Sequence, residues 1–288
     1  RIGQSVMADG ARFQMLSGEV NCGGSGTAVL LIGYVGGTPL LGSAYADILG
    51  GTFSATGLVD DASIYIGSHR PGTLTVAGTN GVSAAVNVAR IYFGWWDTSA
   101  NYATTSRCDI GSNAVVSASV AVLRKNELGL GRLFLHKGGT LRTPTVYAAA
   151  GAMDFHFDGG KLELTAPSNT LFAGAGMRVF ADADSEVDIG TNTVQMTAPF
   201  TGSASLVKTG SGTLRFGGDH TGFAGTLAVQ NGNLAVTNLT GGSGMTVRLA
   251  GGTAVDLTAL LALAPRLAVD GNASVAVANE GVTLSAVT

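Results

Sequence analysis

The chain has 288 residues, of which 44 are glycine, 45 % are hydrophobic and only 12 % are charged. This much apolar material excludes a disordered chain, and the scarcity of charged helix formers excludes a coiled coil. The net charge of −3 comes from scattered residues without a basic stripe, so we expect no nucleic-acid partner. No segment approaches the ~20 apolar residues of a membrane-spanning helix.

Short alternating segments recur along the chain, and in each one two apolar residues flank a central residue. This alternation predicts strands with one buried face. Glycine-rich turn dipeptides separate the segments, which therefore predict an all-β chain without long helices. In chain order the segments are residues 64–66, 74–76, 91–93, 133–135, 162–164, 214–216, 227–229, 234–236 and 247–249.

Two stretches interrupt this pattern. Residues 94–107 lack alternation and carry both tryptophans, which indicates an inserted aromatic loop. Residues 257–264 have the only helical pattern, and Pro265 ends it, so we expect one short helix there. Nothing else in the composition marks a boundary, and we therefore expect one continuous domain over 1–288.

A glycine, a small polar residue and a large apolar residue recur as one phrase. Gly51 and Gly72 are 21 residues apart, Gly139 and Gly160 are also 21 apart, and Gly212 and Gly232 are 20 apart. A sandwich would favour two-residue hairpins, and a propeller would need a period of ~40–50 residues. A period near 20 fits a parallel β-helix, a solenoid of stacked coils.

The glycine of the phrase is expected at a corner of each coil. There a positive φ or a close backbone contact would exclude a Cβ atom. At about 21 residues per coil, the 288 residues predict about 13 coils.

The two cysteines, Cys22 and Cys108, are 86 residues apart and thus about four coils apart. At ~4.8 Å per coil they are separated by roughly 19 Å, whereas a disulfide needs Cα atoms within ~7 Å. We therefore expect two separate thiols within one chain; a bond between chains remains an alternative.

The densest aromatic cluster consists of Tyr92, Trp95, Trp96 and Tyr102. Such side chains stack on sugar rings or bury against a partner chain. The alternative is that the loop folds back and covers its own coil. The cluster is the candidate contact for glycans or a protein partner.

Alternate residues in two stretches carry potential metal ligands. Asp182, Asp184, Glu186 and Asp188 share one parity, which predicts either a calcium site or a solvated acidic ridge on one face. The second stretch places Asp154, His156 and Asp158 outward if the intervening phenylalanines point inward. An ordinary solvated strand face is the alternative for this trio.

Signatures of catalysis are weak. Polysaccharide-cleaving β-helix enzymes place acids or arginines on adjacent coils beside a cleft. Here Asp182, Asp184 and Asp188 could serve as acids, and Arg178 or Arg215 as bases. The chain has no nucleophile elbow, phosphate-binding loop, dinucleotide fingerprint or paired Cys-x-x-Cys, so we do not expect an enzyme or a resident cofactor.

The stretch 206–236 runs Leu-x-Lys-x-Gly-x-Gly-Thr-Leu, then Gly and Thr-Gly, then Gly-x-Leu. It resembles the passenger-associated repeat of bacterial autotransporters, and residues 155–162 resemble the coil that often precedes that repeat. The resemblance implies a right-handed parallel β-helix that is secreted and displayed at the cell surface of a diderm bacterium. The repeat carries no catalytic residues in that family, so it implies none here.

Three functions follow in order of preference. Residues 11–20 and 282–287 have strand patterns without a polar or helical cap, and open strand edges invite further strands. The first prediction is therefore an extracellular structural protein that self-associates head to tail into a fibre or surface layer. The second is an adhesin that binds glycans through the aromatic loop, and the third is a polysaccharide-cleaving enzyme.

Overall fold

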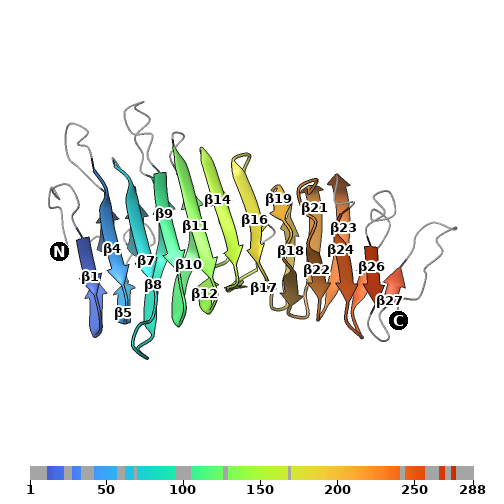
Figure 1. Cartoon of the computed structure of the whole chain (residues 1–288), viewed down its shortest axis with the longest axis horizontal. Helices are drawn as coiled ribbons and strands as arrows, with labels where there is room; N and C mark the ends of the chain where they lie inside the picture. Colours follow the sequence, from blue (N-terminus) through green and yellow to red (C-terminus); the bar gives the residue numbers. More distant parts are fainter. Residues whose placement is uncertain are drawn as a thin grey trace.

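A computed structural model of the protein describes eleven segments of the chain. Within them every regular element is a β-strand, and no helix occurs. The strands stack side by side into an elongated body, with β1 near one end and β27 near the other (Figure 1). The described residues are 12–22, 28–33, 42–56, 62–67, 70–94, 105–125, 129–167, 170–240, 244–256, 266–269 and 274–276.

All paired strands run parallel and form three faces, as a parallel β-helix requires. Face 1 is an eight-stranded sheet of β1 (Arg12–Met15), β4 (Ala44–Ile48), β7 (Gly72–Val76), β9 (Thr105–Ile110), β11 (Leu130–His136), β14 (Ala152–Asp158), β16 (Met177–Ala183) and β19 (Phe200–Gly202).

Face 2 contains the longest uninterrupted series of strands. It consists of β2 (Glu19–Cys22), β5 (Gly51–Ala55), β8 (Ala84–Phe93), β10 (Ala114–Arg124), β12 (Gly139–Arg142), β15 (Lys161–Glu163), β17 (Ser185–Asp188), β20 (Leu206–Thr209), β22 (Thr226–Val229), β24 (Thr246–Leu249) and β26 (Arg266–Val269).

Face 3 closes the coil. Its strands are β3 (Ala28–Ile32), β6 (Ala62–Ile66), β13 (Val146–Ala148), β18 (Thr193–Met196), β21 (Thr213–Asp219), β23 (Asn233–Thr240), β25 (Ala254–Asp256) and β27 (Ser274–Ala276). The second halves of β8 and β10 also belong to this face, beside β3, β6 and β13. Isolated bridges at Tyr147 and Thr170 continue the face toward β18.

Coil length changes along the solenoid. On face 2 the first three strands begin at residues 19, 51 and 84, whereas the last four begin at residues 206, 226, 246 and 266. The period of about 20 residues is therefore confirmed for the C-terminal coils, but the N-terminal coils are longer. For this reason eleven strands follow one another on face 2 in the described residues, fewer than the expected 13 coils.

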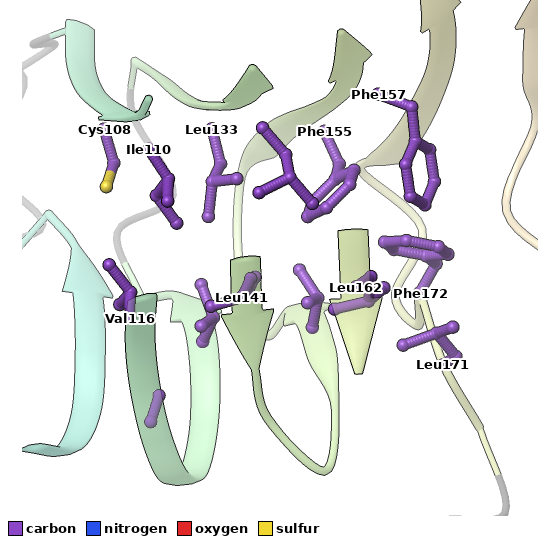
Figure 2. Packing of buried hydrophobic residues seen from close by; sticks show 14 of the residues in the cluster. Cys108, Ile110, Val116, Leu133, Leu141, Phe155, Phe157, Leu162, Leu171 and Phe172 are labelled. Carbon is purple, nitrogen blue, oxygen red and sulfur yellow. The ribbon is translucent and has the colours of Figure 1, made fainter. Parts of the chain in front are cut away.

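The core is a set of inward rows in which the same strand position is apolar in successive coils. On face 1, Leu74 aligns with Cys108, then with Leu133 and Phe155, and all four are fully buried. Leu141 and Leu162 of face 2 lie opposite this row (Figure 2). Each such side chain contributes roughly 1.5–3 kcal/mol by leaving water, so stability accumulates along the axis.

The recurring glycines do lie where a Cβ atom is excluded. A Cβ on Gly212 would lie 2.0 Å from the carbonyl oxygen of Asn192 in the preceding coil. Gly232 has a φ of +72°, and its Cβ would lie 2.4 Å from the carbonyl oxygen of Gly212. Close approach and positive φ thus both occur in the phrase, as the sequence predicted.

The remaining sequence predictions fall partly outside the described residues. The short helix expected at 257–264 lies outside them. Residues 95–104 of the expected aromatic loop also lie outside them, and residues 105–107 belong to β9 rather than to a loop. Cys22 and Cys108 are both free, in agreement with the expectation of two thiols.

Replacing the corner glycine tests the close packing of coils. We expect Gly212→Ala to lower the free energy of unfolding by about 1–3 kcal/mol, because the added methyl group overlaps backbone that cannot rotate away. Gly244→Ala is the matched control, since the nearest atoms to its Cβ would be the Ala224 Cβ at 3.2 Å and the Ala224 Cα at 3.5 Å. Urea unfolding measures both, and equal effects of the two changes would contradict the assignment.

Candidate functional site

The four acidic residues expected on one face lie on two faces and the corner between them. Asp182 belongs to β16 of face 1, Asp184 follows that strand, and Glu186 and Asp188 belong to β17 of face 2. The expectation of one shared face is wrong, because the chain turns a corner at Asp184. The described residues contain no group of three or more His, Cys, Asp or Glu that could hold a metal ion.

Each of these acids already has a partner. The Asp182 carboxylate lies 2.6 Å from His156 Nδ1, and Asp184 accepts a hydrogen bond from the Ser205 backbone N–H. Lys161 Nζ lies 3.1 Å from Glu186 and 3.3 Å from Asp188. The acids on face 2 are therefore neutralised by a neighbouring coil rather than left open as an acidic ridge.

Only Tyr92 of the expected aromatic cluster lies in the described residues; Trp95, Trp96 and Tyr102 lie outside them. Tyr92 is buried and stacks on Tyr65 of the preceding coil, with ring centres 4.4 Å apart and an interplanar angle of 8°. One face of its ring is therefore covered by a neighbouring coil. Contact with glycans through Trp95 and Trp96 stays a prediction from the sequence.

The richest group of polar side chains lies on the outer side of face 1. Alternate residues of four neighbouring strands point outward there, and parallel register aligns them across the coils. We call this group the outer patch: Arg107 and Asp109 of β9; Arg132, Phe134 and His136 of β11; Asp154, His156 and Asp158 of β14; and Arg178, Phe180 and Asp182 of β16.

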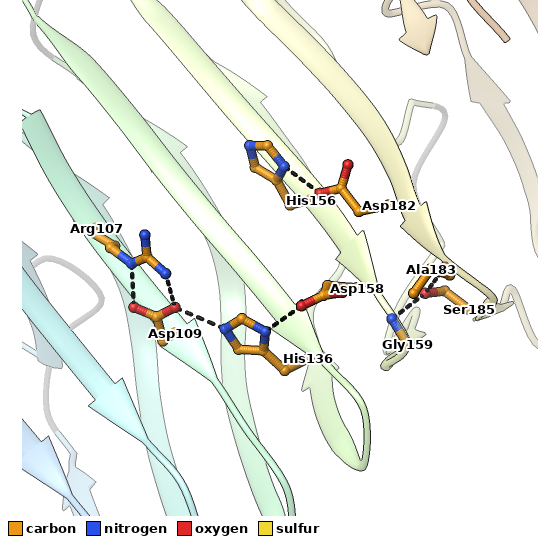
Figure 3. Close-up of polar contacts among 9 residues, drawn as sticks. All are labelled: Arg107, Asp109, His136, His156, Asp158, Gly159, Asp182, Ala183 and Ser185. Carbon is orange, nitrogen blue, oxygen red and sulfur yellow. Dashed lines mark hydrogen bonds and ion pairs between the residues drawn. The ribbon is translucent and has the colours of Figure 1, made fainter. Parts of the chain in front are cut away.

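A chain of charge pairs crosses the outer patch (Figure 3). Arg107 donates to both carboxylate oxygens of Asp109, over 2.6 and 2.7 Å. His136 lies between Asp109 and Asp158, with nitrogen–oxygen distances of 2.8 and 2.6 Å. Burial opposes ionisation of Asp109, but the hydrogen bonds from Arg107 and His136 outweigh it and lower its pKa.

The Asp154 carboxylate is also paired with cations of neighbouring strands. Its nearly buried carboxylate accepts a 2.7 Å hydrogen bond from Arg178 Nε, and Arg132 Nε lies 3.9 Å away. The trio Asp154, His156 and Asp158 does point outward, as the alternation predicted. Its three members bond to different partners, however, and do not converge on one point.

The aromatic rings of the outer patch stack on one another along the axis. His156 lies 4.2 Å from the Phe134 ring and 4.6 Å from the Phe180 ring, with interplanar angles of 14° and 8°. Arg107 Cζ lies 4.0 Å from the centre of the Phe134 ring. The ring faces therefore cover each other, and the stack does not present a flat platform for a sugar.

Two shallow depressions follow the corner between faces 1 and 2, with volumes of about 630 and 390 Å³. They share Gly159 and Asp184 in their lining. The carboxylates that line them, Asp158, Asp184 and Glu186, are already hydrogen-bonded within the chain.

A buried lysine is the residue that sequence reasoning missed. Lys208 occupies the inward row of face 2, between Val187 and Val229, and is fully buried. Its ammonium donates to the backbone carbonyl of Gly210 over 2.7 Å and also to that of Asn231. Burial lowers its pKa to about 8. The break in strand alternation at Lys208 was the available signal.

His220 is buried in the same region, with 1 % of its surface exposed. Its ring stacks on Phe216 at 4.1 Å, and neither ring nitrogen makes a well-formed hydrogen bond within the described part of the chain. Burial lowers its pKa to about 4. His220 is therefore an uncharged core residue at neutral pH.

A scan against protein-family models, a search of curated proteins and a search of solved structures found no match to this chain. Its described residues also include no helix long and apolar enough to cross a membrane.

Acid should destabilise the protein through His220. The unfolded chain takes up this proton near the ordinary value of 6.5, whereas the folded chain resists it until about pH 4. Stability should therefore fall as the pH drops through this window, by roughly 3 kcal/mol in total. His220→Phe, which keeps the stacked ring, should remove this part of the pH dependence in urea unfolding. Parallel pH profiles of the two proteins would contradict the prediction.

Proposed function

We propose that the chain is a structural solenoid of a bacterial cell surface, a rigid rod that assembles end to end. The observation that carries the proposal is the parallel ladder, in which each coil is hydrogen-bonded to the next from β2 to β26. Outer charges also pair between successive coils, as in His136 with Asp158 and Arg142 with Glu163. Both sets of bonds stiffen the body along its axis.

The state of two outer carboxylates, Asp109 and Glu163, argues against their serving as the acid of a polysaccharide-cleaving enzyme. A glycosidase needs a carboxylic acid with a raised pKa to protonate the leaving group. Burial alone would raise the pKa of Asp109 and of Glu163, but hydrogen bonds from neighbouring cations lower both. These groups are therefore ionised at neutral pH and are poor proton donors.

The extracellular location rests on the resemblance of residues 206–236 to the autotransporter repeat. In the structure this stretch supplies β20, β21, β22 and the start of β23, which is about one and a half coils. Its lysine, Lys208, bonds to carbonyls of two successive coils. The repeat thus has a mechanical role in joining coils, which supports a structural function.

End-to-end assembly would continue the same ladder between two copies. Within the described residues, β2 is paired only with β5, and β26 only with β24. Gly18 and Cys22 direct their carbonyl groups toward β5. Because residues of a parallel strand alternate in the direction of their hydrogen bonds, the N–H of Asn21 points to the open edge. A second copy could accept a hydrogen bond from it.

Asn21→Pro tests the assembly. Proline removes this one N–H without touching the hydrogen bonds to β5, so we expect the variant to stay monomeric at concentrations where the unaltered chain forms rods. Asn21→Ala keeps the N–H and is the matched control. Sedimentation velocity and electron microscopy provide the readout. Rods in the proline variant, or monomers in every sample, would overturn end-to-end assembly through this edge.

A further inference from the structure

His136 lies between two carboxylates that belong to the coils before and after its own. Its Nε2 lies 2.8 Å from Asp109 Oδ1 on β9, and its Nδ1 lies 2.6 Å from Asp158 Oδ2 on β14 (Figure 3). One side chain therefore links three successive coils on the outside of face 1. No other described histidine has a carboxylate at both ring nitrogens.

The chemistry of these contacts fixes the protonation state. An ionised carboxylate only accepts hydrogen bonds, so each ring nitrogen must donate. A neutral imidazole carries one N–H group, whereas an imidazolium carries two. Both short contacts therefore require the charged ring. If the proton leaves, a nitrogen lone pair faces a carboxylate oxygen, and one of the two links becomes repulsive.

We propose that His136 is a proton-operated clamp, which ties β9, β11 and β14 together while its ring is charged and releases one of them in alkaline surroundings. The inference is independent of the proposed function, because it rests on the geometry of this group alone.

Other charged groups around His136 do not replace its contacts with Asp109 and Asp158. Arg107 is already bound to both oxygens of Asp109 and holds that carboxylate in place. Lys137 follows His136 in the chain, and Asp184 of a later coil lines the same depression. On the strands themselves, Arg132 approaches Asp154 and His156 approaches Asp182, so neither competes for the two carboxylates of the clamp.

The sign of the effect follows from the two carboxylates. Burial disfavours the charged ring, but the hydrogen bonds to Asp109 and Asp158 outweigh it and raise the pKa of His136 above its ordinary 6.5. A raised value in the folded state means that the clamp stabilises fully at pH values below 6.5. Its contribution is lost as the pH rises through the folded-state value.

The direct test is an NMR titration of the histidine ring nitrogens in the full chain. We expect the midpoint of the His136 titration to lie above 6.5, with both ring nitrogens protonated on its acid side. Asp109→Asn and Asp158→Asn should each lower that midpoint, because each removes one charged partner. A midpoint at or below 6.5 would overturn the proposal without any variant having to fold.

The second measurement asks whether the clamp stabilises the coils. We expect the difference in urea-unfolding stability between the unaltered chain and His136→Gln to shrink as the pH rises through the NMR midpoint. Arg142→Gln is the matched control, because it removes a 2.7 Å ion pair between coils on face 2 that contains no histidine. Its effect should be constant from pH 6 to 9. A constant effect of His136→Gln would show that the ring is not a clamp.

Discussion

The whole structure depends on the hydrogen-bond ladder between successive coils. Because every coil pairs in parallel with the next, an inward residue of one strand lies directly over an inward residue of its neighbour. That register creates the buried rows of the core and, on the opposite side of the same strands, the aligned charges and rings of the outer patch. A slip of one residue would exchange the two sets.

The ladder sets two requirements on the sequence at the corners. The backbone of one coil closely approaches that of the previous coil, so positions such as Gly212 cannot carry a side chain. The carbonyl groups that the corner turns away from the strands also need donors, and Lys208 supplies one ammonium to two of them. In one repeat, glycine therefore permits the close backbone approach at the corner, and the buried lysine supplies donors to its carbonyl groups.

The sequence was sufficient for the fold class because its two signals, alternation and the recurring glycine phrase, are local. It was insufficient for the site because contacts across the outer patch depend on coil length. His136 follows Asp109 by 27 residues and precedes Asp158 by 22, so a fixed period of 21 could not have aligned all three. Because the corner positions depend on coil length as well, the alternation alone did not reveal the corner at Asp184. This corner places Asp182 on face 1 and Glu186 and Asp188 on face 2.

A histidine on the outside of the coils and a histidine in the core make the stability of the protein depend on pH in opposite directions. Outside, His136 gains a proton on folding because two carboxylates hold it. Inside, His220 resists a proton because burial disfavours its charged ring more strongly than the neighbouring Asp219 carboxylate favours it. The first term weakens the coils in alkali and the second weakens them in acid. These two histidines, in different coils, thus shift the stability of the ladder in opposite directions as the pH changes.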